Sequence, residues 1–264
     1  MYGEPTQLLT NGNHLDVLIA GEGQPTVVFV CGFSGTLDVW RLVQPRLAED
    51  CQALSYNRAG LGRSTMASKG NTLADFAEEL FQLLTVAKIY TPIILVAHSM
   101  GAYVARNFID RYPDKVAGLV IVEGGHERIH LESILTEEEE ATWNKRFNQA
   151  LEQASPANKK EMQALYKLFT QPELEVPKFS NLPNIPIHVI LSIQEAFQGH
   201  GESAKNEREI IHKLVERQCK QHPRCTLVTT SQSGHVTQEE EPDLVISTIR
   251  ENISQARIGV GIPS

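Results

Sequence analysis

A serine flanked by small residues stands where an apolar segment meets a helical pattern. The apolar segment, Ile93 to Ala97, runs into Ala97-His98-Ser99-Met100-Gly101. Small residues on both sides permit a turn too tight for larger side chains, and such a turn strains the serine and exposes its hydroxyl. The start of the following helix favours the negative charge that develops when a serine attacks a carbonyl. The pattern predicts Ser99 as a nucleophile, and the alternative is a structural turn in which Ser99 only caps the helix.

A serine hydroxyl becomes a good nucleophile only when a neighbouring imidazole takes its proton. His235 follows the last apolar segment, Thr226 to Thr229, and a turn of small residues, Ser231 to Gly234. We therefore predict His235 as the base, because it comes after the last expected strand. His98 lies inside the turn around Ser99, and we expect it to pack and to form hydrogen bonds rather than to react.

A carboxylate must orient that imidazole, and the chain order serine, acid, histidine leaves two candidates. Glu123 ends the apolar segment Leu119 to Val122 and precedes two glycines, which allow a free turn into a cleft. Glu195 follows the apolar segment Ile187 to Ile193 and leads into a long polar stretch, which leaves its geometry open. We favour Glu123 and keep Glu195 as the alternative acid.

Strands that alternate with helices must position these residues. Continuous apolar segments are typical of strands covered on both faces, and helical patterns separate them. A hairpin around Asn11-Gly12 comes first, and Asn71 is the expected N-cap of the first long helix. The expected strands are 7–10, 14–20, 26–30, 52–56, 93–97, 119–122, 187–193 and 226–229, with helices that include 73–84, 100–112 and 242–256. This alternation predicts one α/β domain with a doubly wound, mostly parallel sheet.

One long stretch interrupts the alternation, because residues 127–185 contain no strand pattern. Thr136 and Glu139 form a capping-box pattern for a charged helix, and a second helix is expected from Ser155-Pro156. We predict a helical cap at 127–185, inserted between the sixth and seventh strands of a catalytic domain formed by 1–126 and 186–264. Aromatic residues of this cap are the candidates for substrate contact, namely Trp143, Phe147, Tyr166 and Phe169.

Four stretches together resemble the α/β-hydrolase superfamily of serine hydrolases. They are Val30-Cys-Gly-Phe33, Tyr56-Asn-Arg-Ala-Gly-Leu-Gly-Arg-Ser64, Ala97 to Gly101 and Ser233-Gly-His235. The resemblance implies an α/β-hydrolase fold whose catalytic histidine lies in the loop after the last strand. It also implies an oxyanion hole formed by the backbone N–H groups of Phe33 and Met100.

The sequence departs from the family pattern in the loop after the third strand, where Cys31-Gly32 replaces the usual His-Gly. The exchange preserves the oxyanion donors because they are backbone groups. The glycine-rich turn from Arg58 to Ser64 lacks the spacing of a phosphate-binding loop. We expect Arg58 and Arg63 to tie loops together rather than to bind phosphate.

The resemblance implies a carboxylesterase that cleaves small to medium acyl esters without a metal or cofactor. A serine nucleophile disfavours epoxide hydrolases and haloalkane dehalogenases, which use a carboxylate at this position. Thioesterase, lactonase, amidase, perhydrolase and carbon–carbon hydrolase chemistry stay open. A ligand sensor on the same fold is a further alternative, because fold alone does not assign function.

Composition restricts the partners. The 264 residues carry 24 basic and 32 acidic side chains, so the net charge is −8, a poor match for nucleic acid or an anionic membrane. No secretory signal pattern and no apolar segment of roughly 20 residues is present. We expect a cytoplasmic protein whose partner is a small-molecule ester, with its oligomeric state open. Cys219 and Cys225 bracket a turn and could approach each other, but that location favours free thiols over a disulfide.

Overall fold

An eight-stranded sheet in the order β1-β2-β4-β3-β5-β6-β7-β8 forms the centre of the molecule. The structure is a computed structural model that describes residues 3–66, 70, 72–125, 137–170, 177–193 and 201–260. Only β2 pairs antiparallel with its neighbours β1 and β4, and the other pairs are parallel. The strands are Thr6–Thr10, Asn13–Ala20, Val27–Val30, Ala53–Tyr56, Ile93–His98, Val116–Val122, Ile187–Ser192 and Cys225–Thr230. The predicted doubly wound, mostly parallel sheet is confirmed.

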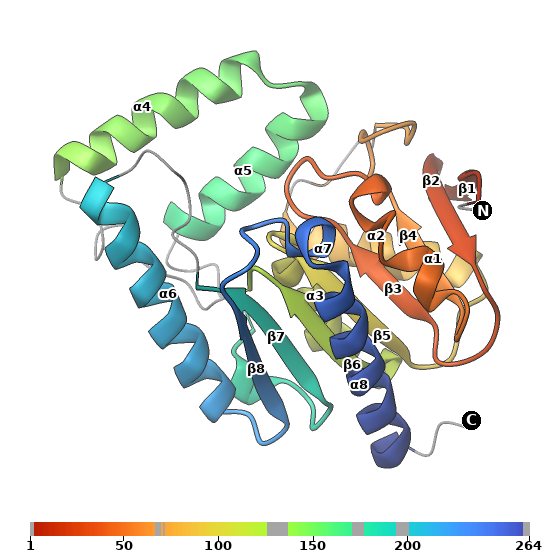
Figure 1. Cartoon of the computed structure of the whole chain (residues 1–264). Coiled ribbons are helices and arrows are strands. Elements are labelled where there is room, and N and C mark those ends of the chain that lie inside the picture. The colour runs from red at the N-terminus through yellow and green to blue at the C-terminus, as the bar shows by residue number, and fades with distance from the viewer. Residues whose placement is uncertain are drawn as a thin grey trace.

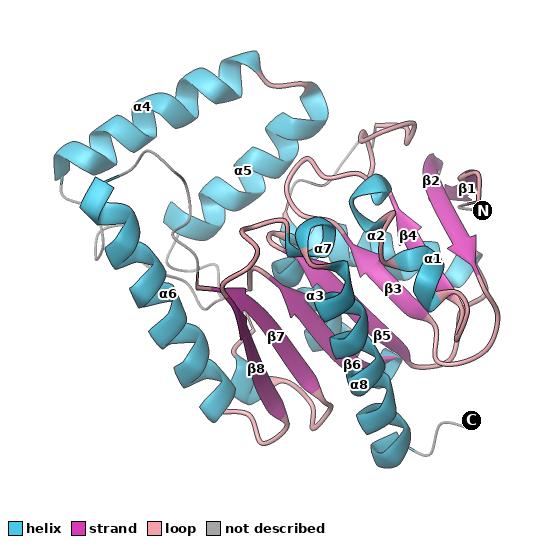
Figure 2. Cartoon of the chain, in the orientation of Figure 1, coloured by secondary structure: helices cyan, strands magenta, loops and turns pink. Residues whose placement is uncertain are grey.

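Helices cover both faces of the sheet (Figures 1 and 2). The α-helices α1 to α8 are Gln44–Leu47, Leu73–Val86, Gly101–Arg111, Glu137–Gln153, Pro156–Thr170, Gly201–Lys220, Thr237–Glu240 and Pro242–Val260. Short 3-10 helices are η1 (Leu37–Trp40), η2 (Pro113–Lys115) and η4 (Phe179–Asn181). Within the described residues no helix is both long and apolar enough to cross a membrane.

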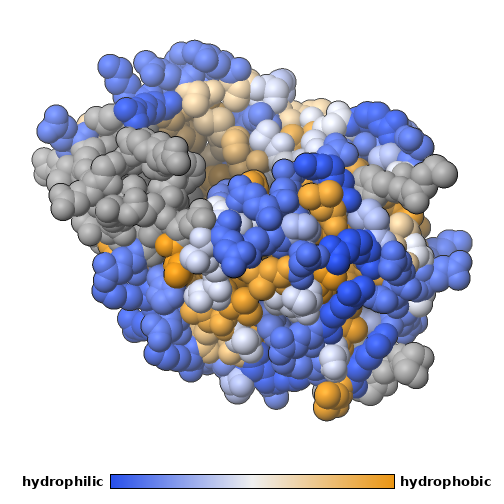
Figure 3. Space-filling model, in the orientation of Figure 1, coloured by the Kyte–Doolittle hydropathy of each residue, from blue (hydrophilic) through white to orange (hydrophobic). Residues whose placement is uncertain are grey.

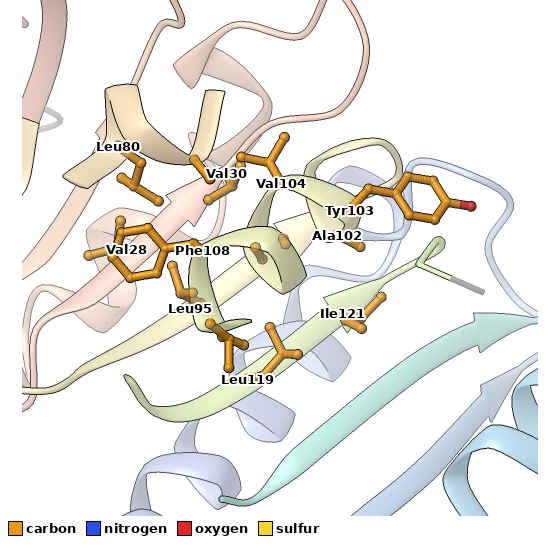
Figure 4. Close-up of a cluster of buried hydrophobic side chains, with 14 of the residues drawn as sticks. Val28, Val30, Leu80, Leu95, Ala102, Tyr103, Val104, Phe108, Leu119 and Ile121 are labelled. Atoms are coloured by element: carbon orange, nitrogen blue, oxygen red, sulfur yellow. The ribbon is translucent and has the colours of Figure 1, made fainter. Parts of the chain in front are cut away.

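The core has two layers because successive side chains of a strand point to opposite faces. Leu95 of β5 packs with Leu80 of α2 and Phe108 of α3 in one layer (Figure 4). Ala97 of β5 belongs to the same layer. Val96 of the same strand packs in the other layer with residues of α1 and α8. Both layers are buried, which explains why the sequence shows continuous apolar segments rather than an alternation of apolar and polar residues. On the face shown in Figure 3, hydrophilic residues surround smaller hydrophobic areas.

The helix α2 begins at Leu73, and its N-cap lies one residue later than the prediction. Its N-cap is Thr72, whose hydroxyl accepts a hydrogen bond from the Asp75 N–H at 3.1 Å. The Asp75 carboxylate accepts in return from the Thr72 N–H at 3.0 Å. The predicted N-cap, Asn71, was wrong, because the residue three positions before Asp75 is the one that completes this reciprocal pair. Asn71 itself lies outside the described residues.

The two cysteines at the connection between α6 and β8 are paired. Cys219 and Cys225 form a disulfide with their Cα atoms 4.9 Å apart. The expectation of free thiols at these positions was wrong, because the short turn from α6 to β8 brings both side chains together. Cys31 and Cys51 are buried free thiols.

The segment between β6 and β7 contains the two expected helices, α4 and α5. Figure 1 shows them beyond one end of the sheet rather than against either face. Thr136, the expected start of the first helix, lies outside the described residues. Contacts from α5 reach the segments that follow β3 and β4, as described below, so α5 lies over the ends of the strands that carry the candidate site.

Candidate active site

Ser99 stands between β5 and α3 with the backbone conformation that a tight turn requires. Its φ angle is +52°, in the left-handed region, and its N–H donates to the Val122 carbonyl at 3.0 Å. A Cβ atom on Gly124 would lie 2.6 Å from the Ser99 Cα, and one on Gly101 would lie 2.5 Å from the Val30 carbonyl oxygen. Only glycine fits at either position, so the small residues permit the turn, as the sequence predicts.

His235 lies beside Ser99 although 136 positions separate them in the chain. Its Nε2 is 3.0 Å from the Ser99 Oγ. The residue lies between β8 and α7, where the Gly234 N–H donates to the Glu240 carboxylate at 2.5 Å. This contact orders the loop that carries the imidazole.

His98 supports the same loop from behind. Its Nε2 lies 2.7 Å from the His235 carbonyl oxygen, and the two rings are tilted with centroids 4.8 Å apart. Because a carbonyl only accepts, the Nε2 of His98 must carry the proton. Burial lowers the pKa of His98 to about 4, with a smaller contribution from His235. His98 is therefore a neutral packing and hydrogen-bonding residue at neutral pH, as expected.

Glu123 is the acidic residue that the fold brings to His235. It is buried, it follows β6 with a φ of +51°, and its Oε2 lies 3.5 Å from the His235 Nδ1. Its other oxygen accepts from the Ser192 N–H, and the Ser192 hydroxyl donates to the Ser233 carbonyl. The alternative acid, Glu195, lies outside the described residues. The described part of the site thus places Ser99, His235 and Glu123 in one line, with 3.0 Å between Ser99 Oγ and His235 Nε2 and 3.5 Å between His235 Nδ1 and the Glu123 carboxylate.

The loop after β3 approaches the same serine. A Cβ atom on Gly32 would lie 2.9 Å from the His98 Nδ1 and 3.0 Å from the Ser99 Cβ. Phe33, next along the chain, is 40% exposed, whereas Met100 on the other side of Ser99 is buried. Phe33 and Met100 are the two residues predicted to supply oxyanion donors. Phe33 follows Gly32, which packs on Ser99, and Met100 follows Ser99 itself.

A buried arginine ties this loop to its surroundings. The Arg58 guanidinium donates to the carbonyls of Cys31 and Gly32 at 2.6 and 2.5 Å, and its Nε donates to Glu161 at 2.6 Å. Burial lowers the pKa of Arg58, but the neighbouring Glu161 outweighs it, so the net shift is upward. Arg63 pairs with Asp16 at 2.8 Å. Both arginines tie loops together, as the sequence predicts.

Cys31 occupies the position where the family usually has histidine. Its thiol donates to the Thr36 carbonyl at 3.2 Å, and burial raises its pKa to about 11. Cys31 is therefore a protonated thiol whose hydrogen bond to Thr36 stabilises the loop. The exchange leaves the backbone path past Ser99 intact.

Sequence reasoning missed Glu161, which reaches this loop from α5. The sequence does contain a pattern that indicates a buried carboxylate there. Glu161 interrupts the apolar stripe of that helix, which the buried residues Ala157, Ala164 and Leu168 form. A charged residue on the buried face of an amphipathic helix needs a partner. Only the tertiary structure identifies that partner as Arg58.

The predicted substrate-contact residues lie on the helices α4 and α5. Phe147 and Tyr166 stack on each other with ring centroids 4.8 Å apart, so each ring helps to join the two helices. The side chains of Trp143 and Phe169 lie outside the described residues. Across the described ranges, no group of three or more His, Cys, Asp and Glu side chains is arranged to hold a metal ion.

The sheet order and the strained serine after β5 define an α/β hydrolase, and comparison with known proteins agrees. The sequence model of the alpha/beta hydrolase fold matches residues 25–174, so the chain belongs to this family. An AB hydrolase superfamily protein of Gibberella zeae is 35% identical over 117 residues, which cover 43% of this chain and 36% of the relative. A Cronobacter sakazakii protein assigned as the carbamate hydrolase RutD is 32% identical over 103 residues, covering 39% and 38%. The matches thus span little more than a third of these relatives.

Solved structures share the fold over nearly the whole chain. The haloalkane dehalogenase DbeA from Bradyrhizobium elkani superposes with a TM-score of 0.76 and 14% identity, covering 97% of this chain and 99% of that protein. A thermophilic esterase from Thermogutta terrifontis superposes with a TM-score of 0.68 and 17% identity, covering 96% and 99%. These neighbours cleave different bonds. The fold therefore identifies the hydrolase family but not the bond that this chain cleaves, which depends on the residues of the site.

Proposed function

We propose that this protein is a serine hydrolase that cleaves small to medium carboxylic esters through an acyl-enzyme on Ser99. One observation carries the proposal: the Ser99 Oγ lies 3.0 Å from the His235 Nε2, and the Nδ1 of the same ring lies 3.5 Å from the buried Glu123 carboxylate. A hydroxyl, an imidazole and a buried carboxylate in this order are the arrangement that activates a serine. The reaction needs no metal or cofactor.

In the first half-reaction, the Ser99 Oγ attacks the ester carbonyl carbon while its proton passes to the His235 Nε2. The carbon–oxygen bond to the alcohol then breaks, and His235 returns the proton to the leaving alcohol. The Glu123 carboxylate accepts from the His235 Nδ1–H, which orients the ring and stabilises its cation. An acyl-enzyme and a free alcohol result.

In the second half-reaction, water attacks the acyl carbonyl and gives its proton to His235. The bond to the Ser99 Oγ breaks, the proton returns to that oxygen, and the carboxylic acid leaves. In both steps, the backbone N–H groups of Phe33 and Met100 donate to the oxygen that becomes negative. Preorganised donors of this kind stabilise the transition state more than the ground state.

Apolar side chains next to these donors suit an acyl chain. Phe33 is 40% exposed and Val236, directly after His235, is 37% exposed. The segment 127–185 acts as a cap on a catalytic domain made of 1–126 and 186–264, and Trp143, Phe147, Tyr166 and Phe169 bound the acyl group from the cap side. Burial of a short acyl chain between Phe33 and the cap would favour apolar over charged substrates.

Turnover of p-nitrophenyl esters of increasing acyl length tests the proposal, with a thioester, an amide and a carbamate beside them. The carbamate is included because of the relative assigned to that activity. We expect the highest kcat/KM for an ester, and we expect Ser99→Ala to lose on the order of 10⁴-fold or more. A fluorophosphonate probe should label the wild type at Ser99 and leave Ser99→Ala unlabelled.

A ligand sensor on the same fold gives a different result. Its ligand affinity would be equal in the wild type and in Ser99→Ala, and no multiple turnover would occur with any member of the panel. Absence of both turnover and probe labelling would refute the esterase proposal. Turnover of the carbamate alone would keep the serine mechanism and replace the substrate class.

A further inference from the structure

A carboxylate from the cap helix α5 contacts the loop that carries a proposed oxyanion donor. We propose that Glu161 is a positioning residue that holds the loop from Cys31 to Ser34 in its active geometry, so that docking of the cap and competence of the oxyanion hole are coupled. This inference rests on the proposed serine-hydrolase function. Glu161 acts through its neighbours and touches no reacting atom in the proposed mechanism.

Each oxygen of the carboxylate holds a different donor. The Oε1 accepts from the Arg58 Nε at 2.6 Å, and the Oε2 accepts from the Ser34 N–H at 2.6 Å. The side chains of Glu161 and Arg58 are only 3% and 2% exposed. Ser34 directly follows Phe33, so Glu161 fixes the peptide unit that joins Phe33 to Ser34, next to a proposed oxyanion donor.

Arg58 extends the same contact to the start of the loop. Its two terminal nitrogens donate to the carbonyls of Cys31 and Gly32. Ser34 has a φ of +56°, a conformation that is unfavourable for a residue with a side chain. The ion pair therefore holds both the carbonyls before Phe33 and the strained residue after it.

The segment between β6 and β7, which contains α5, is anchored to the sheet independently of Glu161. The buried Arg106 of α3 donates to the Gly125 carbonyl at 2.6 Å, where the chain leaves β6, and to the Pro177 carbonyl at 2.8 Å, where it returns. Leu168 and Ala164 of α5 also belong to the core. Loss of the Glu161 contact should therefore loosen the loop without detaching the segment.

Stability alone does not account for a carboxylate at this position. Replacing a buried ion pair by apolar residues of similar size is often neutral or stabilising, because the charges lose their hydration. Ala157, Ala164 and Leu168 show that the surrounding stripe of α5 is apolar. What an apolar side chain could not supply is the pair of acceptors that orders Arg58 and Ser34.

Glu161→Gln removes one of these acceptors and keeps the size of the side chain. An amide has one acceptor oxygen, and its NH₂ group would face either the Arg58 Nε or the Ser34 N–H, a donor against a donor. We expect kcat for the best ester to fall about 10–100-fold with KM little changed, because a small misplacement of an oxyanion donor acts on the transition state. Amide hydrogen exchange across residues 31–36 should accelerate.

A double variant separates positioning from stability. Arg58→Met together with Glu161→Met removes both charges and preserves volume, so it should fold even if Glu161→Gln does not. We expect the double variant to unfold near the wild-type temperature and still to show the reduced kcat and the faster exchange at 31–36. A double variant with wild-type kcat and wild-type exchange would overturn the inference.

Two control variants bound the effect. Asp16→Asn breaks the ion pair with Arg63, which ties the turn from Arg58 to Ser64 to β2. Asp16 has no contact with Glu161. Glu152→Gln changes an exposed carboxylate on α4. Both should keep kcat and the exchange at 31–36 close to wild type, and a loss in Asp16→Asn equal to that in Glu161→Gln would indicate only general destabilisation and overturn the inference.

The exchange measurement also distinguishes this inference from the proposed function. If the wild type shows no turnover and no probe labelling, the hydrolase proposal fails, while faster exchange at 31–36 in Glu161→Gln still supports positioning. If the wild type is active and both kcat and exchange are unchanged in Glu161→Gln, the positioning role fails and the hydrolase proposal stands.

Discussion

His98 donates through its Nε2 to the backbone carbonyl of His235, at 2.7 Å. The residue next to the proposed nucleophile thus holds the loop of the proposed base. The contact explains why a histidine can lie buried beside Ser99 without reacting, since its proton is already used in a hydrogen bond to the backbone.

His98→Phe should lower kcat about tenfold by releasing the His235 loop, a small misplacement of the base. The variant should also change how protein stability depends on pH.

Because the pKa of His98 is about 4 in the folded protein, below its usual 6.5, the unfolded chain binds the proton more readily. Wild-type stability therefore falls as the pH drops from about 6.5 to 4, by at most about 3 kcal/mol for this group.

Urea unfolding at pH 7.5 and pH 4.5 measures this difference. We expect the loss of stability between the two pH values to be smaller in His98→Phe than in the wild type. An identical loss in both proteins would show that His98 does not titrate as described. His222, a buried histidine in the turn after α6, supplies a control substitution away from the site.

Glu123→Gln should reduce kcat by on the order of 10⁴, as in other enzymes that lose the acid of a serine, histidine and acid set. Glu195→Gln should stay near wild type if Glu123 is the acid. The measurement is steady-state turnover of the same ester by both variants. The reverse result would assign the role to Glu195, and wild-type rates in both would remove the acid from the mechanism.

Glu79 of α2 is a partly buried carboxylate outside the proposed reaction. Both of its oxygens lie 3.2 Å from the Ala59 N, and burial raises its pKa to about 7 from the usual 4.5. The folded protein therefore binds this proton more tightly than the unfolded chain. The contribution to stability is complete below about pH 4.5 and is lost as the pH rises through about 7.

Glu79→Gln mimics the protonated form at every pH. We expect it to stabilise the protein by about 1–3 kcal/mol at pH 8.5 and to have little effect at pH 4.5. Chemical denaturation at both pH values checks the prediction. Equal effects at the two pH values would argue against the raised pKa.

Thr72→Ala should destabilise the protein by about 1 kcal/mol, because it removes the side chain that caps α2. Asn71→Ala is the matched control and should have a much smaller effect. Thermal unfolding distinguishes the two. A larger effect of Asn71→Ala would restore the N-cap that the sequence first suggests.

Local patterns in the sequence predicted most of the sheet and two residues of the candidate site. The segments that became β3, β5 and β6 are almost continuously apolar because both of their faces are buried, and that property is visible within a few residues. Ser99 was predictable because the turn between β5 and α3 requires small neighbours on both sides. His235 was predictable from its place after the last strand.

What the tertiary structure decided are contacts between distant segments. Glu161 and Arg58 are 103 positions apart, and Glu123 reaches His235 only because β6 and the loop after β8 end at the same edge of the sheet. The disulfide between Cys219 and Cys225 likewise depends on how closely α6 turns into β8. Helical and strand periods and turn sterics act over a few residues, so the sequence by itself determined the elements and the strained turn at Ser99. The pairing of buried charged residues depends on how whole helices and strands pack, so it is visible only in the folded chain.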